Sequence, residues 1–283
     1  MNTDYEIIDT RSGLKAAVAF LEKEDTVAVD LEADSMYHFQ EKVCLIQMAT
    51  KRESLVIDPL QVKDLSPLKS LFSRQDIRKV FHGADYDIRS LYRDFKIAVN
   101  NLFDTELACR FLGIRETGLE AVLKTNFNIN LNKKYQKKDW SKRPLPREMM
   151  DYAAIDVKYL LPLYEILKKE LDRNGRLPWL HEEFEYLSNV RSGLSDDAPL
   201  FLKFKGAGRL KPRSLAVLEG LLQFRRRIAE EKDKPLFKIL GNASLMKIAA
   251  SRPSTPAHLK DLKLISQKQF GMYGTDLVET VIN

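Results

Sequence analysis

Short apolar runs separated by turn residues mark the first part of the chain. Runs of β-branched and other apolar residues predict strands over 27–32, 43–49 and 54–58. Because the turns between these runs are short, the three strands are expected to form an antiparallel meander. A shorter strand over 5–9 comes before them, and Thr10 is expected to cap the helix that follows it.

The pattern then changes to helices and strands in alternation. Helical spacing of apolar residues predicts helices over 66–72, 85–95 and 106–112. Strands are expected over 79–82 and 99–103. Strands joined by helices pair in parallel through right-handed crossovers. The fold class predicted for this part is therefore α/β, a mixed sheet with helices packed on it.

Helices are also predicted for the rest of the chain. A long helix is expected from Pro146, kinked or divided at Pro162 and closed by Gly175. Ser, Asp, Pro and Gly residues then interrupt the apolar pattern, which is typical of a linker. The predicted organisation is a domain over 1–195, a linker over 196–212 and a small all-helical domain over 213–283.

The composition is that of an ordinary globular protein, with 44% apolar and 30% charged residues among 283. No apolar run approaches the roughly 18 residues of a membrane span, and the N-terminus lacks a basic region followed by an apolar one. A cytoplasmic protein without membrane contact is therefore expected. Cys44 and Cys109 lack metal-ligand spacing and are expected to be buried thiols.

Positive charge is concentrated in the C-terminal part. From residue 201 onward, 16 Lys/Arg stand against 7 Asp/Glu, although the whole chain carries only +6. This distribution suits a polyanion partner such as nucleic acid, and chance is the alternative. The candidate phosphate contacts in this part are Arg225 to Arg227, Lys232, Lys234 and the backbone at Gly271 and Gly274.

Two carboxylates interrupt the first long strand. Side chains alternate between the faces of a strand, so Asp30 and Glu32 point the same way. Neighbouring carboxylates repel each other and lose hydration unless a cation or a proton lies between them. A divalent metal is therefore one interpretation of the pair. A strand end that runs into solvent is the alternative.

Further acids occur at helix positions. Asp85 and Asp87 open the predicted helix after His82, where acids also serve simply as caps. Tyr152 and Asp156 lie four positions apart and so share one face of a helix. An aspartate facing the core needs a partner, which a shared metal would provide. A surface aspartate beside a core tyrosine is the alternative.

The order of these acids, together with the segments around them, resembles a known family. D-x-E, VFHGADYDI, NLFDT, KKDWSKRPLP and Y-x-x-x-D are similar to segments of the DEDDy 3′-5′ exonucleases, in particular ribonuclease D and its eukaryotic exosome-associated relatives. The C-terminal segment resembles an HRDC domain, the helicase-and-RNase-D C-terminal module. The resemblance implies a ribonuclease H-like fold for the first domain. Ribonuclease D has two HRDC copies, whereas this chain has room for one.

The resemblance also implies the site and the reaction. It assigns the metal-binding acids to Asp30, Glu32, Asp87 and Asp156, and the tyrosine of the third motif to Tyr152. Asp87 is preferred to Asp85 because an apolar residue follows it directly. Two ions, Mg²⁺ or Mn²⁺, are expected, with Asp30 between them. The implied reaction is 3′-5′ hydrolysis of RNA ends to nucleoside 5′-monophosphates.

The implied partner is RNA with a single-stranded 3′ end, such as a tRNA precursor. A DNA exonuclease and an inactive RNA-binding adaptor are the alternatives. Met36, Tyr37 and His38 are candidates for stacking on a terminal base, with core packing as the other account. The segment over 132–147 is basic and offers phosphate contacts, with a solvated loop as the alternative. The candidates are Lys133, Lys134, Lys137, Lys138, Lys142 and Arg143. The remaining candidates for substrate binding are His82, Lys138, Trp140 and Arg143.

Overall fold

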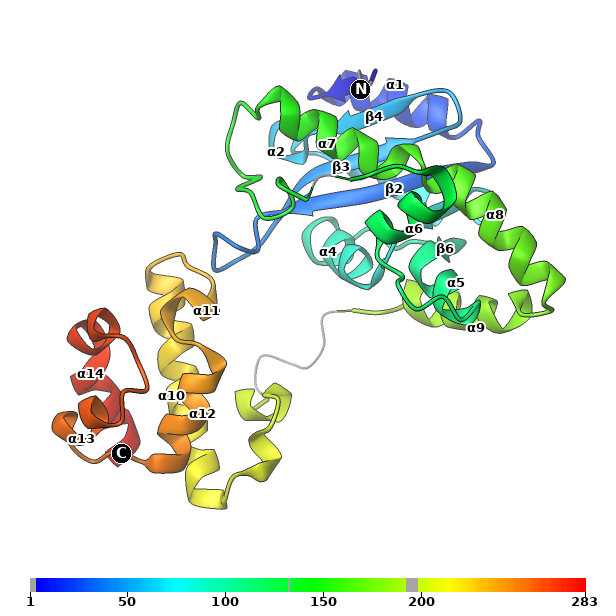
Figure 1. Cartoon of the computed structure of the whole chain (residues 1–283). Coiled ribbons are helices and arrows are strands. Elements are labelled where there is room, and N and C mark those ends of the chain that lie inside the picture. The colour runs from blue at the N-terminus through cyan, green and yellow to red at the C-terminus, as the bar shows by residue number, and fades with distance from the viewer. Residues whose placement is uncertain (1–3, 132, 192–197) are drawn as a thin grey trace. The chain divides into compact units, whose positions relative to one another are not determined.

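The computed structural model describes residues 4–131, 133–191 and 198–283, which form two compact units (Figure 1). The first unit contains the described residues up to Asp34 and from Lys42 to Arg191. The second contains Ser35–Glu41 and the described residues from 198 onward. The predicted boundary between residues 195 and 196 lies outside the described residues.

A six-stranded mixed sheet forms the centre of the first unit, with strand order β1-β4-β3-β2-β5-β6. β2, β3 and β4 pair antiparallel, which confirms the predicted meander. The other pairings, β1 with β4, β2 with β5 and β5 with β6, are parallel. The strands are β1 (Glu6–Ile8), β2 (Thr26–Ala33), β3 (Val43–Ala49), β4 (Ser54–Ile57), β5 (Arg78–Phe81) and β6 (Leu102–Asp104).

Helices cover both faces of this sheet. α1, α3 and α4 contribute to one apolar core, and α5, α6, α8 and α9 contribute to a second. α7 packs on β2, β3 and β4, and Figure 1 shows it lying across these strands. The helices are α1 (Arg11–Leu21), α2 (Pro59–Val62), α3 (Ser66–Ser73), α4 (Asp85–Phe95), α5 (Thr105–Phe111), α6 (Leu119–Phe127), α7 (Arg147–Lys158), α8 (Leu160–Arg173) and α9 (Leu177–Ser188).

The long helix predicted from Pro146 is divided, but not at Pro162. The break between α7 and α8 falls at Tyr159, whose φ of −102° and ψ of 0° leave the helical region. Pro162 lies in the first turn of α8. A proline in a first turn removes no hydrogen bond, because the N–H groups there have no partner within the helix. The position of the break was therefore wrong by one turn.

The second unit is helical, and its helices pack around a core of their own. Its helices are η1 (Leu200–Lys203), η2 (Ala207–Arg209), α10 (Pro212–Glu231), α11 (Leu236–Ile239), α12 (Asn242–Ser251), α13 (Pro256–Asp261) and α14 (Gln267–Ile282). Phe201 and Leu210, from the segment predicted as a linker, pack on this core.

Two of the phosphate contacts predicted in the second unit are wrong. Arg225 is buried, and its guanidinium donates to the Leu240 carbonyl at 3.1 Å and to Asn242 Oδ1 at 2.7 Å. Gly271 and Gly274 lie inside α14, where their backbone N–H groups belong to the helix. Neither group is therefore free to bind a phosphate.

In the first unit Cys44 and Cys109 are both buried and free, as predicted. Among the described residues, no helix has the length and apolar character needed to cross a bilayer.

Candidate metal centre

The alternation of side chains along β2 presents acids to α7. Val27, Val29 and Leu31 belong to the core on the opposite face. Asp30 and Glu32 occupy the intervening positions, and both line a pocket together with α7 residues. The same-face prediction for the two acids is therefore confirmed. Large side chains on one face anchor the strand, while the acids remain on the other.

α7 supplies the other two polar groups at this place. Tyr152 and Asp156, one helical turn apart, both line the same pocket as Asp30. Ala153 and Ala154 are fully buried against the sheet. Small residues here let the helix backbone approach the strands closely, because little side-chain volume separates them.

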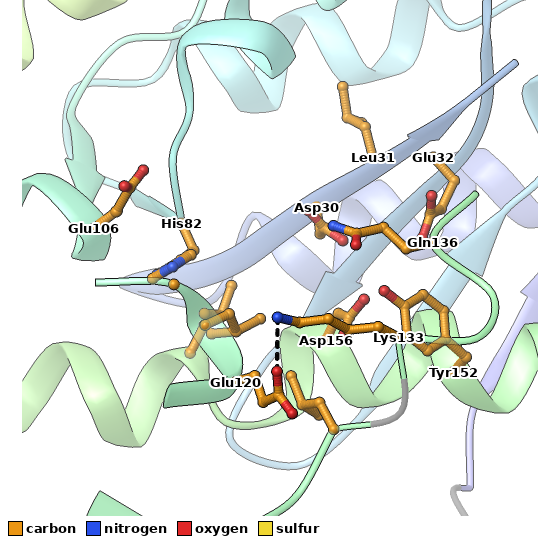
Figure 2. Close-up of a pocket in the computed structure, with 14 residues that line it drawn as sticks. Asp30, Leu31, Glu32, His82, Glu106, Glu120, Lys133, Gln136, Tyr152 and Asp156 are labelled. Carbon is orange, nitrogen blue, oxygen red and sulfur yellow. Dashed lines mark ion pairs between the residues drawn. The ribbon is translucent and has the colours of Figure 1, made fainter. Parts of the chain in front are cut away.

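Three carboxylates converge at this contact between strand and helix. Asp30, Glu32 and Asp156 each offer an oxygen, and these atoms all lie within 4.8 Å of one another. Figure 2 shows Asp156 and the Tyr152 hydroxyl pointing toward the acids of β2. Glu32 and Asp156 are buried, and Asp156 Oδ1 has no hydrogen-bond partner among the described residues.

Burial makes the charged forms of these acids costly. It raises the pKa of Asp30 to about 6. Burial, together with repulsion between neighbouring carboxylates, raises the pKa of Glu32 and that of Asp156 well above their usual range. Such a group is stabilised in its charged state by a cation held between the oxygens. The donor set is entirely oxygen, which fits a hard divalent ion and not zinc.

The fourth predicted acid, Asp87, lies in the first turn of α4 and is buried. Burial, followed by the charges of Asp30 and Asp104, raises its pKa well above the usual range. Asp85, in contrast, is exposed and pairs with Arg89 at 2.8 Å, which lowers the pKa of Asp85. These positions favour Asp87 over Asp85 as the member of the acidic site.

The turn that precedes α4 is held by Asp104, which also caps α5. Asp104, at the end of β6, accepts hydrogen bonds from the N–H groups of Glu106 and Leu107 in α5. It also accepts from Gly83 N at 2.9 Å and Ala84 N at 2.8 Å, just before α4. One carboxylate therefore fixes the helix on which Asp87 stands. Nothing in the local sequence pattern indicates this second role.

A cavity of about 360 Å³ extends from the acids toward His82 and Glu106 (Figure 2). His82 Nδ1 is 2.9 Å from Thr105 Oγ1, and Thr105 donates to the Phe81 carbonyl at 2.9 Å. The Thr105 hydroxyl therefore accepts from His82 Nδ1–H, so the proton of the neutral ring lies on Nδ1. Burial lowers the pKa of His82, which favours this neutral form.

Comparison with known proteins identifies the family of the chain. Residues 5–172 match the family model described as a 3′-5′ exonuclease. The chain belongs to the 3′-5′ exonuclease family. Residues 214–281 match the HRDC domain, so the chain carries an HRDC domain in its second unit. The exonucleases of this family use divalent metals, which agrees with the acidic cluster.

The relatives of this chain include RRP6-like 2 of Arabidopsis thaliana, which is 32% identical over 99% of the chain and 34% of its own length. Ribonuclease D of Bartonella henselae is 32% identical over 94% of the chain and 66% of its own length. The chain thus spans only part of these relatives. Among solved structures, Escherichia coli RNase D superposes with a TM-score of 0.79 at 26% identity, covering 99% of this chain and 75% of that one.

Three of the predicted substrate contacts, Met36, Tyr37 and His38, lie in the second unit. His38 Nδ1 is 2.6 Å from Asp233 Oδ2, and Asp233 Oδ1 accepts from Phe39 N. Lys238 lies over the ring of Tyr37, 4.5 Å from its centroid. Met36 is exposed. For these residues, a role in stacking on a terminal base stays a prediction.

Three further candidates, Lys138, Trp140 and Arg143, lie within the basic segment that precedes α7. Lys138 is exposed, as a phosphate contact would be. Trp140 is fully buried and has no surface with which to touch RNA. Arg143 directs its guanidinium to Asp58 and to backbone carbonyls within the first unit. The placement of Trp140 and Arg143 therefore does not support direct contact with substrate.

Proposed function

We propose that this exonuclease is a metal-dependent 3′-5′ exoribonuclease that releases nucleoside 5′-monophosphates from RNA 3′ ends. The observation that carries the proposal is the convergence of Asp30, Glu32 and Asp156 within 4.8 Å, beside Tyr152, in one cavity. We propose RNA rather than DNA as the substrate because the relatives include enzymes named ribonuclease D.

In this proposal the buried acids hold two divalent ions, Mg²⁺ or Mn²⁺. Asp30 would help to hold both ions, Glu32 and Asp156 one of them, and Asp87 the other. The ions would supply a nucleophilic hydroxide and relief of negative charge on the leaving 3′-oxygen. The acids keep the ions at one place on the sheet, because β2 and α7 pack directly on each other.

Tyr152 orients the attacking water in this mechanism. Burial, with the nearby charges of Asp156 and Glu32, raises the pKa of its hydroxyl far above the usual range. The hydroxyl therefore stays protonated and acts as a hydrogen-bond donor rather than as a base. Its place on the same helical face as Asp156 directs it into the cavity (Figure 2).

The proposed substrate is structured RNA with a single-stranded 3′ end, with tRNA precursors as the first candidate. The solved structure of Escherichia coli RNase D is described as that of an exoribonuclease involved in structured RNA processing, which supports this choice. A cytoplasmic location is part of the proposal.

Parallel assays on RNA and DNA of one sequence with a 3′ overhang test the proposal. Wild-type protein with Mg²⁺ or Mn²⁺ is expected to shorten the RNA from its 3′ end, and EDTA to stop it. Asp30→Asn and Asp156→Asn are expected to abolish trimming. Asp85→Asn is the matched control, because Asp85 is exposed and paired with Arg89.

Each of the other outcomes points to another function. Faster trimming of DNA than of RNA would overturn the ribonuclease assignment in favour of a DNA exonuclease. Binding of RNA without degradation of either substrate would indicate an inactive adaptor. Full activity of the Asp30→Asn variant would contradict the proposed metal-dependent mechanism.

A further inference from the structure

The guanidinium of Arg143 is fully occupied within the first unit. Its Nε and Nη2 atoms donate to Asp58 at 2.6 and 2.8 Å, which makes a bidentate ion pair. Nη2 also donates to the Cys44 carbonyl at 2.7 Å. Nη1 donates to the carbonyls of Trp140 and Lys142, both at 2.7 Å. These bonds use every N–H donor that an arginine has.

The bonds of Arg143 connect three separate segments. Asp58 follows β4 and caps α2, since it accepts from Leu60 N at 3.0 Å. Cys44 lies in β3. Trp140 belongs to the basic segment that precedes α7. Arg143 thus fastens that segment to the ends of two strands of the sheet, in a site where both partners are mostly buried.

The bonds of Arg143 determine the position of the Trp140 indole. The ring is fully buried in a cluster with Met149, Met150 and Ala153, and Tyr152 packs against the same cluster. The ring centroids of Trp140 and Tyr152 are 6.2 Å apart. Trp140 Nε1 has no hydrogen-bond partner among the described residues. The indole is therefore positioned by packing and by its own backbone, which Arg143 holds.

We propose that Arg143 and Asp58 are positioning residues that act through Trp140 to fix the ring of Tyr152, and that Arg143 is not a substrate contact. The inference rests on the proposed function, because it concerns the residue that orients the attacking water. Displacing a reacting group by about 1 Å can lower a rate about 100-fold. A looser indole would therefore lower kcat with little change in substrate binding.

Arg143→Lys and Asp58→Asn test this inference. Lysine keeps the charge but cannot form the bidentate pair. Each variant is expected to lower kcat on RNA about tenfold, with KM within about twofold. Because the two residues act as one unit, the double variant should be about as slow as either single variant.

A second readout does not depend on activity. The chain has two tryptophans, and Trp179 is 62% exposed. In a Trp179→Phe background the emission therefore reports on Trp140 alone. Both variants should shift this emission to longer wavelength as the indole loosens. Arg11→Lys and Asp64→Asn are the matched controls, because they alter an exposed Arg–Asp pair of the same unit.

A direct phosphate contact predicts different results. Removal of the charge in Arg143→Gln would raise KM and reduce the salt dependence of binding by about 0.7 in log–log slope. Asp58→Asn would strengthen binding and lower KM, since it frees the guanidinium. Either result would overturn the inference. So would a shift of the Trp140 emission in a variant that keeps the kcat of the active wild type. An inactive wild type would instead refute the proposed function.

Trp140→Phe keeps the test decisive if the ion-pair variants fail to fold. This variant leaves the bonds of Arg143 to Asp58 and to the backbone intact. The smaller ring should lower kcat about tenfold and leave KM unchanged. A Trp140→Phe protein with wild-type kcat would show that the indole does not position Tyr152.

Discussion

Gln47 on β3 lies directly opposite Asp30 on β2 in the antiparallel register. Residues opposite each other in such a pair project to the same face, with Cβ atoms about 5 Å apart. Gln47 is fully buried, and neither its amide nitrogen nor its amide oxygen has a hydrogen-bond partner among the described residues. A buried amide without partners costs stability, so its presence beside the central acid indicates a role there.

Gln47→Met is expected to separate stability from metal binding. The substitution removes a buried amide while keeping a similar volume, so the metal-free protein should become about 1–2 kcal/mol more stable. Binding of Mg²⁺ should weaken, because the metal-bound site loses the unpaired polar amide that lies beside Asp30. Chemical denaturation in EDTA measures the first effect, and calorimetric titration with Mg²⁺ measures the second.

Gln75→Met provides the control for Gln47→Met, since Gln75 is exposed in the first unit. It should change neither quantity. A Gln47→Met protein that is destabilised in EDTA and binds Mg²⁺ as well as wild type would contradict the prediction. That result would mean that the amide is a packing residue and no part of the acidic site.

The stability of the metal-free protein should fall as pH rises from about 4 to about 6. Burial raises the pKa of Asp30 to about 6 in the folded state. Over this window the unfolded chain releases its proton while the folded protein keeps it, so the free energy of unfolding decreases. Thermal unfolding in EDTA across this range measures the slope. Asp30→Asn should make the slope shallower without abolishing it, because burial also raises the pKa of Glu32, Asp87 and Asp156.

Divalent metal should act in the opposite direction. Mg²⁺ binds the ionised carboxylates, so its stabilising effect should grow as pH rises and the protons leave. The test compares unfolding midpoints with Mg²⁺ and with EDTA at pH 5 and at pH 8. An equal gain at both pH values would show that the acids do not change protonation when the ion binds.

Local periodicity was enough to predict which residues share a face of β2 or of α7, but not that β2 and α7 pack against each other. The period of two in β2 places Asp30 and Glu32 on one face, and the period of 3.6 in α7 places Tyr152 beside Asp156. Both patterns depend on neighbours in the chain. That the strand and the helix meet was an inference from the order of motifs, because periodicity alone does not pair distant elements.

The contacts that could not be predicted join residues far apart in the chain. Arg143 and Asp58 are 85 positions apart, and their charges give no sign of each other in sequence. A basic residue near a suspected polyanion site was therefore interpreted as a phosphate contact. The contact between the loop Ser35–Glu41 and Asp233 could not be predicted for the same reason, because His38 and Asp233 are 195 positions apart in the chain.

Asp104→Ala should impair both stability and activity. The carboxylate accepts hydrogen bonds from N–H groups on both sides of it, at Gly83 and Ala84 and at the start of α5. Leaving several buried donors unpaired should cost about 3 kcal/mol. Denaturation measures this loss. At a temperature where the variant is folded, its kcat should still be lowered, because the turn that positions Asp87 is no longer fixed.

The control for Asp104→Ala is Thr10→Ala, which removes the cap of α1 away from the site. Loss of that cap should cost about 1 kcal/mol and leave kcat unchanged. If Asp104→Ala lowered stability without changing kcat in the folded protein, the carboxylate would be a structural cap only.

Tyr152→Phe should lower kcat about 100-fold with KM almost unchanged, because it removes one hydrogen-bond donor aimed at the reacting atoms and no contact with bound RNA. Burial raises the pKa of the hydroxyl far above the usual range, so wild-type activity should show no loss from tyrosine ionisation up to about pH 10. Steady-state rates on RNA across pH measure both effects. Tyr159→Phe, at the break between α7 and α8, is the control. A Tyr152→Phe enzyme with normal kcat would mean that the water is oriented by the acids alone.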